Sequence, residues 1–190
     1  CSFEYLTLHV GAGTFKPVSV EDARHHAMHE EELIIERQSI LRLLQHNGGS
    51  IIPVGTTSMR SLESLYWLGV QLINGKDPGE EFFIDQWEPY RTKTSIPPAE
   101  ALQAIYDYLT ARRMNSISGF TRIMIAPGYR FRMCDALVTN FHQPRSTLLL
   151  LVAAFIGEGW KKAYMFALEH GYRFLSYGDS CLFFPEKEKG

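Results

Sequence analysis

Cysteine is scarce in this 190-residue sequence, and long apolar segments are absent from it. The three cysteines, Cys1, Cys134 and Cys181, are widely spaced, and no Cys-x-x-Cys pair occurs. Such a pattern argues against a disulfide framework or a zinc module and favours a reducing compartment. The longest apolar run, residues 148–156, has nine residues, whereas a helix that spans a bilayer needs about 20. We therefore expect a cytoplasmic protein.

An excess of basic charge is also missing. The formal net charge is −2, although binding to nucleic acid through phosphates usually requires a surplus of Lys and Arg. Any RNA-binding surface must therefore be local, and the arginines that could form one flank the central motifs: Arg122, Arg130, Arg132 and Arg145. A solvated charged face is the simpler interpretation of each. Because 45% of the residues are hydrophobic, the chain can bury a real core, as one large domain or as part of a bigger one.

Apolar periodicity and turn signals predict alternating strands and helices. We expect strands at residues 5–10, 32–36, 51–54, 122–125 and 180–184, and helices at 37–45, 58–68, 98–113, 148–156 and 160–169. This alternation predicts an α/β fold of mostly parallel strands with crossover helices. Residues 69–119 are the least regular part, with a turn predicted at 74–79.

The most informative segment, residues 139–147, reads Thr-Asn-Phe-His-Gln-Pro-Arg-Ser-Thr and precedes the nine-residue apolar run. Pro144 forces a turn, and Ser146 or Thr147 can cap the helix that follows. His142, Asn140 and the helix N-terminus could then bind a polar or anionic ligand and transfer a proton. A plain turn with a good cap is the simpler interpretation.

Two glycine-containing turns follow predicted strands. Gly11-Ala12-Gly13 lacks the third glycine of a dinucleotide fingerprint, so we expect it only to bring the side chains of His9, Thr14 and Phe15 to a strand end. Phe15 could stack on a nucleobase or belong to the core. Gly55-Thr56-Thr57, with Arg60 after it, offers N–H groups and hydroxyls at a helix N-terminus, which suits a carboxylate or a phosphate. An ordinary N-cap with Arg60 as a surface charge is the alternative.

Histidines at positions 25 and 29 are four apart, but they do not form His-Glu-x-x-His and have no evident third ligand. We therefore expect no metal.

Four segments in order resemble one enzyme family, the S-adenosylmethionine:tRNA ribosyltransferase-isomerases of queuosine biosynthesis. They are Thr-Leu-His-Val-Gly-Ala-Gly-Thr-Phe-Lys-Pro-Val at 7–18, Val-Gly-Thr-Thr-Ser with Arg-Ser-Leu-Glu-Ser at 54–64, the 139–147 segment with its Leu-Leu continuation, and Tyr-Arg-Phe with Ser-Tyr-Gly-Asp at 172–179. The resemblance runs from about Leu6 to Phe183. It implies a barrel-like α/β catalytic domain, of which residues 1–190 form the C-terminal part, and a small β-barrel domain that this chain does not contain. The connection at about 69–119 is longer than is usual in the family.

The resemblance also implies a reaction. The ribosyl part of S-adenosylmethionine is transferred to 7-aminomethyl-7-deazaguanine at the tRNA wobble position and isomerised to epoxyqueuosine, with release of adenine and methionine. S-adenosylmethionine is the substrate, and neither a further cofactor nor a metal is expected. Because the chain starts at Cys1 without the family's N-terminal portion, we expect a fragment that has little activity alone.

Several residues of this sequence match the family's motifs. His142 is the first candidate for proton transfer and His9 the second, while Asp135 could fix a histidine tautomer or bind ribose. Gly55, Thr56 and Thr57 could hold the methionine carboxylate or an RNA phosphate. The remaining candidates for substrate binding are Thr14, Phe15, His29, Arg60, Tyr129, Asn140, Arg173, Tyr177 and Asp179.

Two other functions remain open. The chain could be a non-catalytic module that binds tRNA or a nucleotide, or an ordinary S-adenosylmethionine-dependent methyltransferase. The glycine-rich strand-turn-helix and acidic ribose-binding residue of the latter are not found. The reaction products separate the three functions, because methyl transfer yields S-adenosylhomocysteine whereas ribosyl transfer releases adenine.

Overall fold

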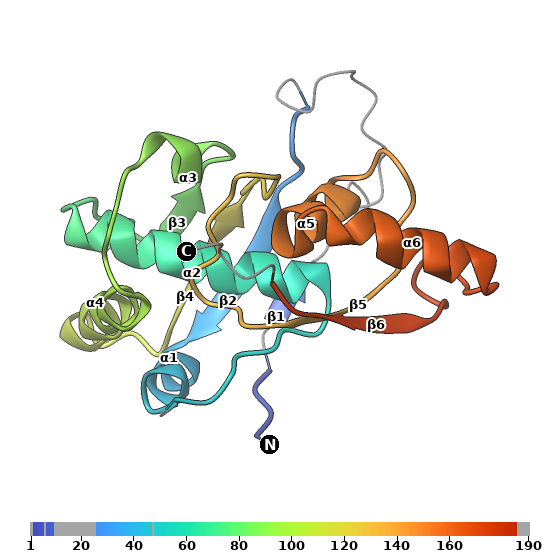
Figure 1. The fold of residues 1–190 in the computed structure, drawn as a ribbon. Coiled ribbons are helices and arrows are strands. Elements are labelled where there is room, and N and C mark those ends of the chain that lie inside the picture. The colour runs from blue at the N-terminus through green and yellow to red at the C-terminus, as the bar shows by residue number, and fades with distance from the viewer. Residues whose placement is uncertain (1, 6, 10–25, 47, 186–190) are drawn as a thin grey trace. The chain divides into compact units, whose positions relative to one another are not determined.

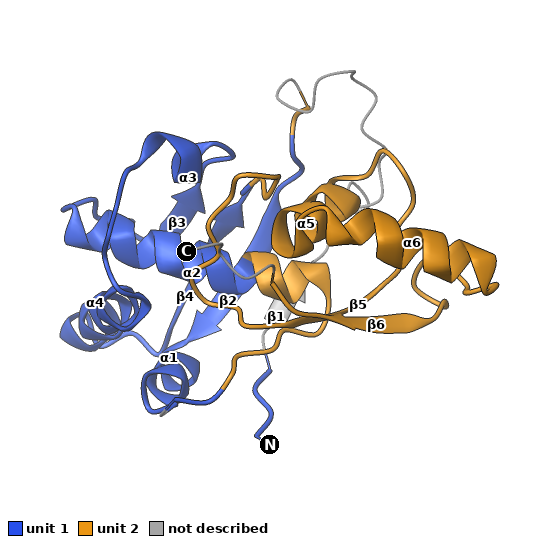
Figure 2. Ribbon diagram, viewed as in Figure 1, with its two compact units in different colours: residues 1–14, 28–49, 61–123 blue, residues 15–27, 50–60, 124–190 orange. Residues whose placement is uncertain are grey.

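The computed structural model describes residues 2–5, 7–9, 26–46 and 48–185, which have a mixed α/β fold (Figure 1). The chain divides into two compact units (Figure 2). Unit 1 comprises residues 1–14, 28–49 and 61–123, and unit 2 comprises residues 15–27, 50–60 and 124–190. Among the described residues, no helix combines the length and the apolar character needed to cross a membrane.

Unit 1 contains a four-stranded sheet in the order β1-β2-β4-β3. The strands are β1 (Thr7–His9), β2 (Glu31–Glu36), β3 (Glu81–Ile84) and β4 (Ser116–Thr121). β2 pairs antiparallel with β1 and β4, while β3 pairs parallel with β4. Thr121 lies opposite Glu31 on one side and Ile84 on the other. The start of β2 and the C-terminal ends of β3 and β4 therefore lie side by side at the same end of the sheet.

The helices of unit 1 are α1 (Arg37–Leu44), α3 (Glu88–Arg91), α4 (Pro98–Ala111) and the larger part of α2 (Thr56–Ile73). α1 packs against α4. α2 approaches α4 so closely at Gly69 that an added Cβ would lie 2.2 Å from the carbonyl oxygen of Ala101. α2 is also tied to the sheet, because the Ser64 hydroxyl donates to Thr121 Oγ1 over 2.8 Å. The apolar side chains of α2 and α4 that face inward, such as Leu68 and Ile105, are fully buried.

Unit 2 is built on a two-stranded antiparallel sheet, β5 (Leu137–Asn140) and β6 (Ser180–Phe183). Val54 adds an isolated parallel bridge to Val138. The helices α5 (Thr147–Ile156) and α6 (Gly159–Glu169) pack against each other. α5 supplies the buried Leu151, Val152 and Phe155, as its continuous apolar sequence predicts.

The predicted helices all form, with ends that shift by a few residues, and so do the strands predicted near the N-terminus, at 32–36 and at 180–184. Residues 51–54 form only the Val54 bridge, and the strand predicted at 122–125 lies instead at 116–121. The sequence did not predict this strand because Gly119 lies inside it, and an interior glycine normally weakens a strand. Here it lies opposite Phe82, where a Cβ would come within 2.3 Å of the Phe82 carbonyl oxygen.

The expectation of mostly parallel strands is not confirmed. Of the four ladders between described strands, three are antiparallel and only β3–β4 is parallel. Alternating strands and helices give a parallel sheet when successive strands pair, whereas here β2 pairs with β4 and β3 takes the outer position. The segment 69–119, the least regular part of the sequence, supplies β3, α3, α4 and part of β4. Its turn at 74–79 forms as predicted, with positive φ at Gly75 and Gly79.

Candidate functional site

The turn after β5 carries the histidine that the sequence singled out. His142 is only 8% exposed. Its ring Nε2 lies 3.0 Å from Thr139 Oγ1, and its backbone N–H donates to the Tyr164 hydroxyl over 3.1 Å. Among the described residues, the second ring nitrogen, Nδ1, has no hydrogen-bond partner. The turn therefore fixes the imidazole through its Nε2.

Burial keeps the titratable groups around this turn neutral. It lowers the pKa of His142 to about 4, raises the pKa of the Tyr164 hydroxyl to about 12 and raises the pKa of the Cys181 thiol to about 11. The thiol donates to the Thr139 carbonyl oxygen over 3.2 Å. At neutral pH the imidazole is thus uncharged: it can accept a proton or a hydrogen bond, but it is not a charged acid. Cys181 remains a thiol and is a poor nucleophile.

An aromatic cluster supports the turn from the side of α6. The Phe141 ring lies 5.3 Å from the ring of Tyr164, 5.7 Å from Tyr172 and 5.5 Å from Phe174, measured between centroids. The Leu175 N–H also donates to the Phe141 carbonyl oxygen over 2.9 Å. Because ring pairs of this kind add to the free energy of simple burial, the cluster holds both the turn and the 172–175 segment in place.

Asn140 joins the turn to the segment that precedes β6. Its amide Nδ2 donates to the carbonyl oxygens of Gly178, over 3.3 Å, and Asp179, over 3.2 Å. The Asp179 carboxylate accepts the Arg173 N–H over 2.7 Å, with the Arg173 Nε 4.0 Å away. The structure thus brings Asn140, Arg173 and Asp179 together. Tyr177 lies on the same segment but is 97% exposed.

The Gly55 turn lies beside the same strand. Gly55 has φ +92° and its N–H donates to the Val138 carbonyl oxygen over 2.8 Å, next to the parallel bridge between Val54 and Val138. α2 begins immediately afterwards at Thr56, which is 6% exposed. The Gly55 turn and the strand residue Val138 thus lie side by side. Arg60 is 2% exposed, which excludes the simpler interpretation of this residue as a surface charge.

Asp135 and Tyr129 have structural partners. The Asp135 carboxylate accepts the Ile51 N–H over 2.8 Å, and the Asp135 N–H donates to the Ile51 carbonyl oxygen over 2.9 Å. Thr139, rather than Asp135, bonds the ring of His142. Tyr129 is 7% exposed and packs edge-on against Phe131, with 5.0 Å between ring centroids.

The helix cap predicted after Pro144 is also present. Ser146 occupies the N-cap of α5, and its hydroxyl oxygen accepts the Leu149 N–H over 3.1 Å. Thr147, the alternative cap, is the first residue of the helix.

The candidates in unit 1 are less completely described. His29 precedes β2, and its Nε2 lies 3.2 Å from Oε1 of Glu31, whose side chain is 1% exposed. His9 lies in β1 with its backbone opposite Glu32. The candidates Thr14 and Phe15 lie outside the described residues. No group of three or more potential metal-ligating side chains occurs in the described part of the chain.

Sequence reasoning missed three residues that hold these candidates. Thr139 was part of the motif but was not recognised as the partner of the His142 ring. Tyr164 has helical spacing typical of a core residue, and Gln86 lies in the least regular part of the sequence. No sequence signal marks Tyr164 or Gln86, because each bonds a residue 22 or 58 positions away.

Comparisons with known proteins agree with the motifs. The sequence model of the family described as "Queuosine biosynthesis protein" matches residues 1–183, and the chain belongs to this family. It is 42% identical over 185 residues to an S-adenosylmethionine:tRNA ribosyltransferase-isomerase from Nitrobacter winogradskyi, which covers 96% of this chain and 40% of that protein. The protein of the same name from Bradyrhizobium diazoefficiens is 43% identical over 182 residues, covering 94% of this chain and 38% of that one.

A solved structure gives the same result for the fold. The crystal structure of an S-adenosylmethionine tRNA ribosyltransferase from Thermotoga maritima matches with a TM-score of 0.52 and 30% sequence identity, covering 80% of this chain and 40% of that chain. The chain thus spans about 40% of the length of the proteins it matches.

Proposed function

We propose that a full-length protein carrying this region transfers and isomerises the ribosyl moiety of S-adenosylmethionine onto 7-aminomethyl-7-deazaguanine at the tRNA wobble position, giving epoxyqueuosine with release of adenine and methionine. The observation that carries this proposal is the family match over residues 1–183, which includes all four motifs. The relatives' names support the substrates, since they specify S-adenosylmethionine, tRNA and ribosyl transfer with isomerisation.

In this proposal, residues 1–190 are the C-terminal part of a barrel-like α/β catalytic domain, and the 69–119 connection is an addition to the family pattern. The remainder of a full-length protein would complete the site, so the 190-residue chain alone is expected to have little activity. The reaction takes place without a metal or any cofactor other than S-adenosylmethionine as substrate, and in the cytoplasm, where its tRNA partner is found.

The geometry of unit 2 supports roles for several candidate residues. The reaction needs a base to remove a proton beside the sulfonium and an acid for the departing adenine. In the tautomer whose Nε2–H donates to Thr139 Oγ1, the neutral imidazole presents an acceptor lone pair at Nδ1. We assign His142 as the base in that tautomer. Asn140 and Asp179 would orient the ribose hydroxyls, while Gly55 and Thr56 at the start of α2 suit a carboxylate.

A product assay tests the proposal. A full-length protein carrying this region is incubated with S-adenosylmethionine and tRNA that contains 7-aminomethyl-7-deazaguanine, and the products are separated by chromatography. We expect adenine and methionine in equal amounts, with the tRNA converted to epoxyqueuosine. Release of S-adenosylhomocysteine would instead identify a methyltransferase, and binding of tRNA without any product would identify a binding module. Assaying the 190-residue chain in parallel tests whether it needs the rest of the protein.

A further inference from the structure

The 69–119 connection reaches the segment that carries His29. In the sheet of unit 1, Thr121 pairs with Glu31 on one side and with Ile84 on the other. The loop that follows β3 and the segment that precedes β2 therefore lie at the same end of the sheet, although they are far apart in the sequence. Ligand sites of α/β proteins form at such an end, beyond the carboxyl ends of parallel strands.

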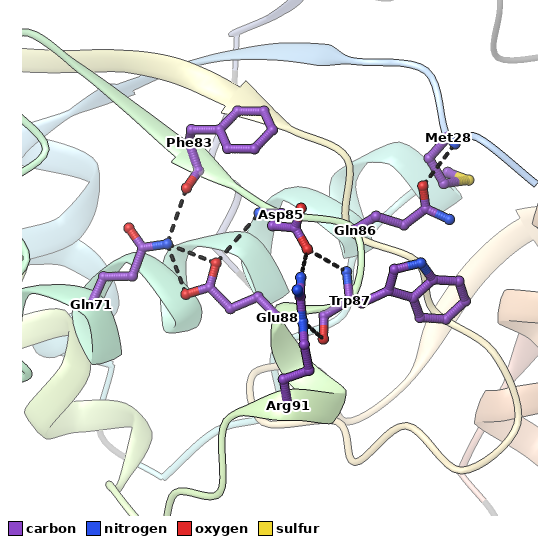
Figure 3. Close-up of polar contacts among 8 residues, drawn as sticks. All are labelled: Met28, Gln71, Phe83, Asp85, Gln86, Trp87, Glu88 and Arg91. Carbon is purple, nitrogen blue, oxygen red and sulfur yellow. Dashed lines mark hydrogen bonds and ion pairs between the residues drawn. The ribbon is translucent and has the colours of Figure 1, made fainter. Parts of the chain in front are cut away.

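Gln86 makes the bond between these two segments. Its side-chain Oε1 accepts the backbone N–H of Met28 over 3.0 Å, in a partly buried position (Figure 3). Met28 is 5% exposed and directly precedes His29. Because a buried N–H without a partner is costly, this bond favours a single path of the backbone where it enters the His29 position.

The loop that presents Gln86 is itself held at several points (Figure 3). The Asp85 carboxylate accepts the Trp87 N–H over 3.0 Å and forms an ion pair with Arg91. The Glu88 carboxylate accepts the Asp85 N–H over 3.3 Å and the Nε2–H of Gln71, on α2, over 2.7 Å. Gln71 Nε2 also donates to the Phe83 carbonyl oxygen over 3.0 Å. Gln86 thus extends from a loop that several hydrogen bonds and an ion pair hold in place.

The anchored segment positions an imidazole. His29 is 15% exposed, with its Nε2 3.2 Å from Oε1 of the buried Glu31. Between them, Glu30 accepts from the Arg122 guanidinium over 2.5 Å at the end of β4. The backbone on the other side of His29 is held by Gln86. The backbone that carries the ring is therefore bonded, one residue before His29, to a residue of the 69–119 connection.

We propose that Gln86 is a positioning residue that acts through His29, a role that rests on the proposed function and on His29 as a substrate-binding residue. The connection provides an anchor that fixes the Met28–His29 backbone in the orientation that the bound substrate requires. If Gln86 merely stabilised the fold, its removal would lower the stability of the protein but would act independently of His29.

The first test uses local hydrogen exchange and needs no substrate. In a full-length protein carrying this region, Gln86→Ala should raise exchange at the Met28 amide by about five- to tenfold, as expected for the loss of one hydrogen bond. Gln86→Glu keeps an acceptor oxygen and should restore protection. The matched control is Gln103→Ala, because Gln103 is exposed and, among the described residues, bonds only Asp107 on its own helix. Equal exchange at Met28 in Gln86→Ala and Gln103→Ala would overturn the proposal.

The second test is a double-mutant cycle on adenine release. Gln86→Ala should lower kcat by roughly tenfold in the otherwise unchanged protein, because the imidazole is misplaced. In a His29→Ala background the same substitution should change kcat less than about twofold, since its effect passes through the missing ring. A similar loss in both backgrounds would show an independent structural role and refute the proposal. A wild-type protein that releases no adenine would refute the proposed function, whereas the exchange test reports on Gln86 separately.

Discussion

Glu88 in unit 1 and His142 in unit 2 respond to the same physical cause in opposite ways. Burial raises the pKa of the Glu88 carboxyl and lowers the pKa of the His142 imidazole to about 4. In each case burial disfavours the charged form. Because one group is an acid and the other a base, protonation favours the folded state through Glu88 and disfavours it through His142.

The surroundings of the two residues differ as well. Glu88 lies among groups that stabilise negative charge, since Gln71 donates to both its carboxylate oxygens, at 2.8 and 2.7 Å. Near His142, burial also keeps Tyr164 and Cys181 neutral. The Gln71 donors oppose the effect of burial on Glu88 but do not reverse it, whereas burial alone shifts the pKa of His142. The comparison teaches that hydrogen-bond donors around a buried group lessen the pKa shift that burial causes.

The largest expected effect is on the rate of adenine release when the neutral His142 imidazole is removed. In a full-length protein carrying this region, His142→Ala should lower the rate of adenine release by a factor on the order of 10² if the ring takes the proton. S-adenosylmethionine binding, measured by calorimetry, should change much less.

The matched control for this prediction is His170→Ala, because His170 is exposed at the end of α6, where its ring stacks on Phe166 and its Nδ1 lies 2.8 Å from the Phe166 carbonyl oxygen. It should release adenine at the wild-type rate. Folded His142→Ala protein with undiminished adenine release would remove His142 from the catalytic residues.

The second effect is on the pH dependence of the free energy of unfolding. The pKa of His142 is about 4 in the folded state and 6.5 in the reference state, so the unfolded chain binds the proton more tightly. The contribution of neutral His142 to the free energy of unfolding is fully present above pH 6.5. It is lost as the pH drops towards 4, by about 2 kcal/mol at pH 5. Urea titrations at pH 7 and pH 5 should show this loss in the wild type but not in His142→Gln. The exposed-site variant His170→Gln keeps His142 and should lose stability like the wild type; an equal loss in His142→Gln would contradict the prediction.

Tyr164→Phe should have a smaller effect. The substitution removes the hydroxyl that accepts the His142 N–H and leaves that buried amide unpaired, at a cost of about 1–2 kcal/mol in the free energy of unfolding. Tyr172→Phe is the matched control in the same aromatic cluster, because no hydrogen bond of the Tyr172 hydroxyl occurs among the described residues. Its unfolding free energy, from the same urea titration, should stay within about 0.5 kcal/mol of the wild type. Equal losses would show that the hydroxyl bond contributes nothing.

The smallest expected effect is the pH dependence of stability that Glu88 causes, which is opposite in sign to that of His142. The pKa of Glu88 is raised in the folded state by burial above the ordinary value of 4.5. Its contribution to stability is therefore fully present below pH 4.5 and is lost as the pH rises through the folded-state pKa. The unfolding free energy of the wild type minus that of Glu88→Gln should increase on acidification from pH 7 to pH 5. A difference that falls over this interval would contradict the raised pKa and the contrast between the two units.

Local sequence patterns were sufficient for the elements that depend on near neighbours. Apolar periodicity predicted the helices, and Pro144 with Ser146 predicted the turn and the cap of α5. The Gly-Thr-Thr motif was expected after a strand, and the bridge between Val54 and Val138 brings it close to the Thr-Asn-Phe-His motif. These features follow from the sequence because a strand end, a proline turn and a helix cap are each specified within a few residues.

Only the tertiary structure decided which distant residues became partners. The pairing of β4 with both β2 and β3 could not be derived from their order, because periodicity specifies an element but not its neighbour. Asp135 bonds Ile51, while the ring of His142 bonds Thr139. The neutrality of that ring depends on burial among residues brought from β6 and α6, and the sequence alone gives no measure of such desolvation. Sequence thus determined the local conformations and the candidate motifs, whereas packing determined their charge states and their partners.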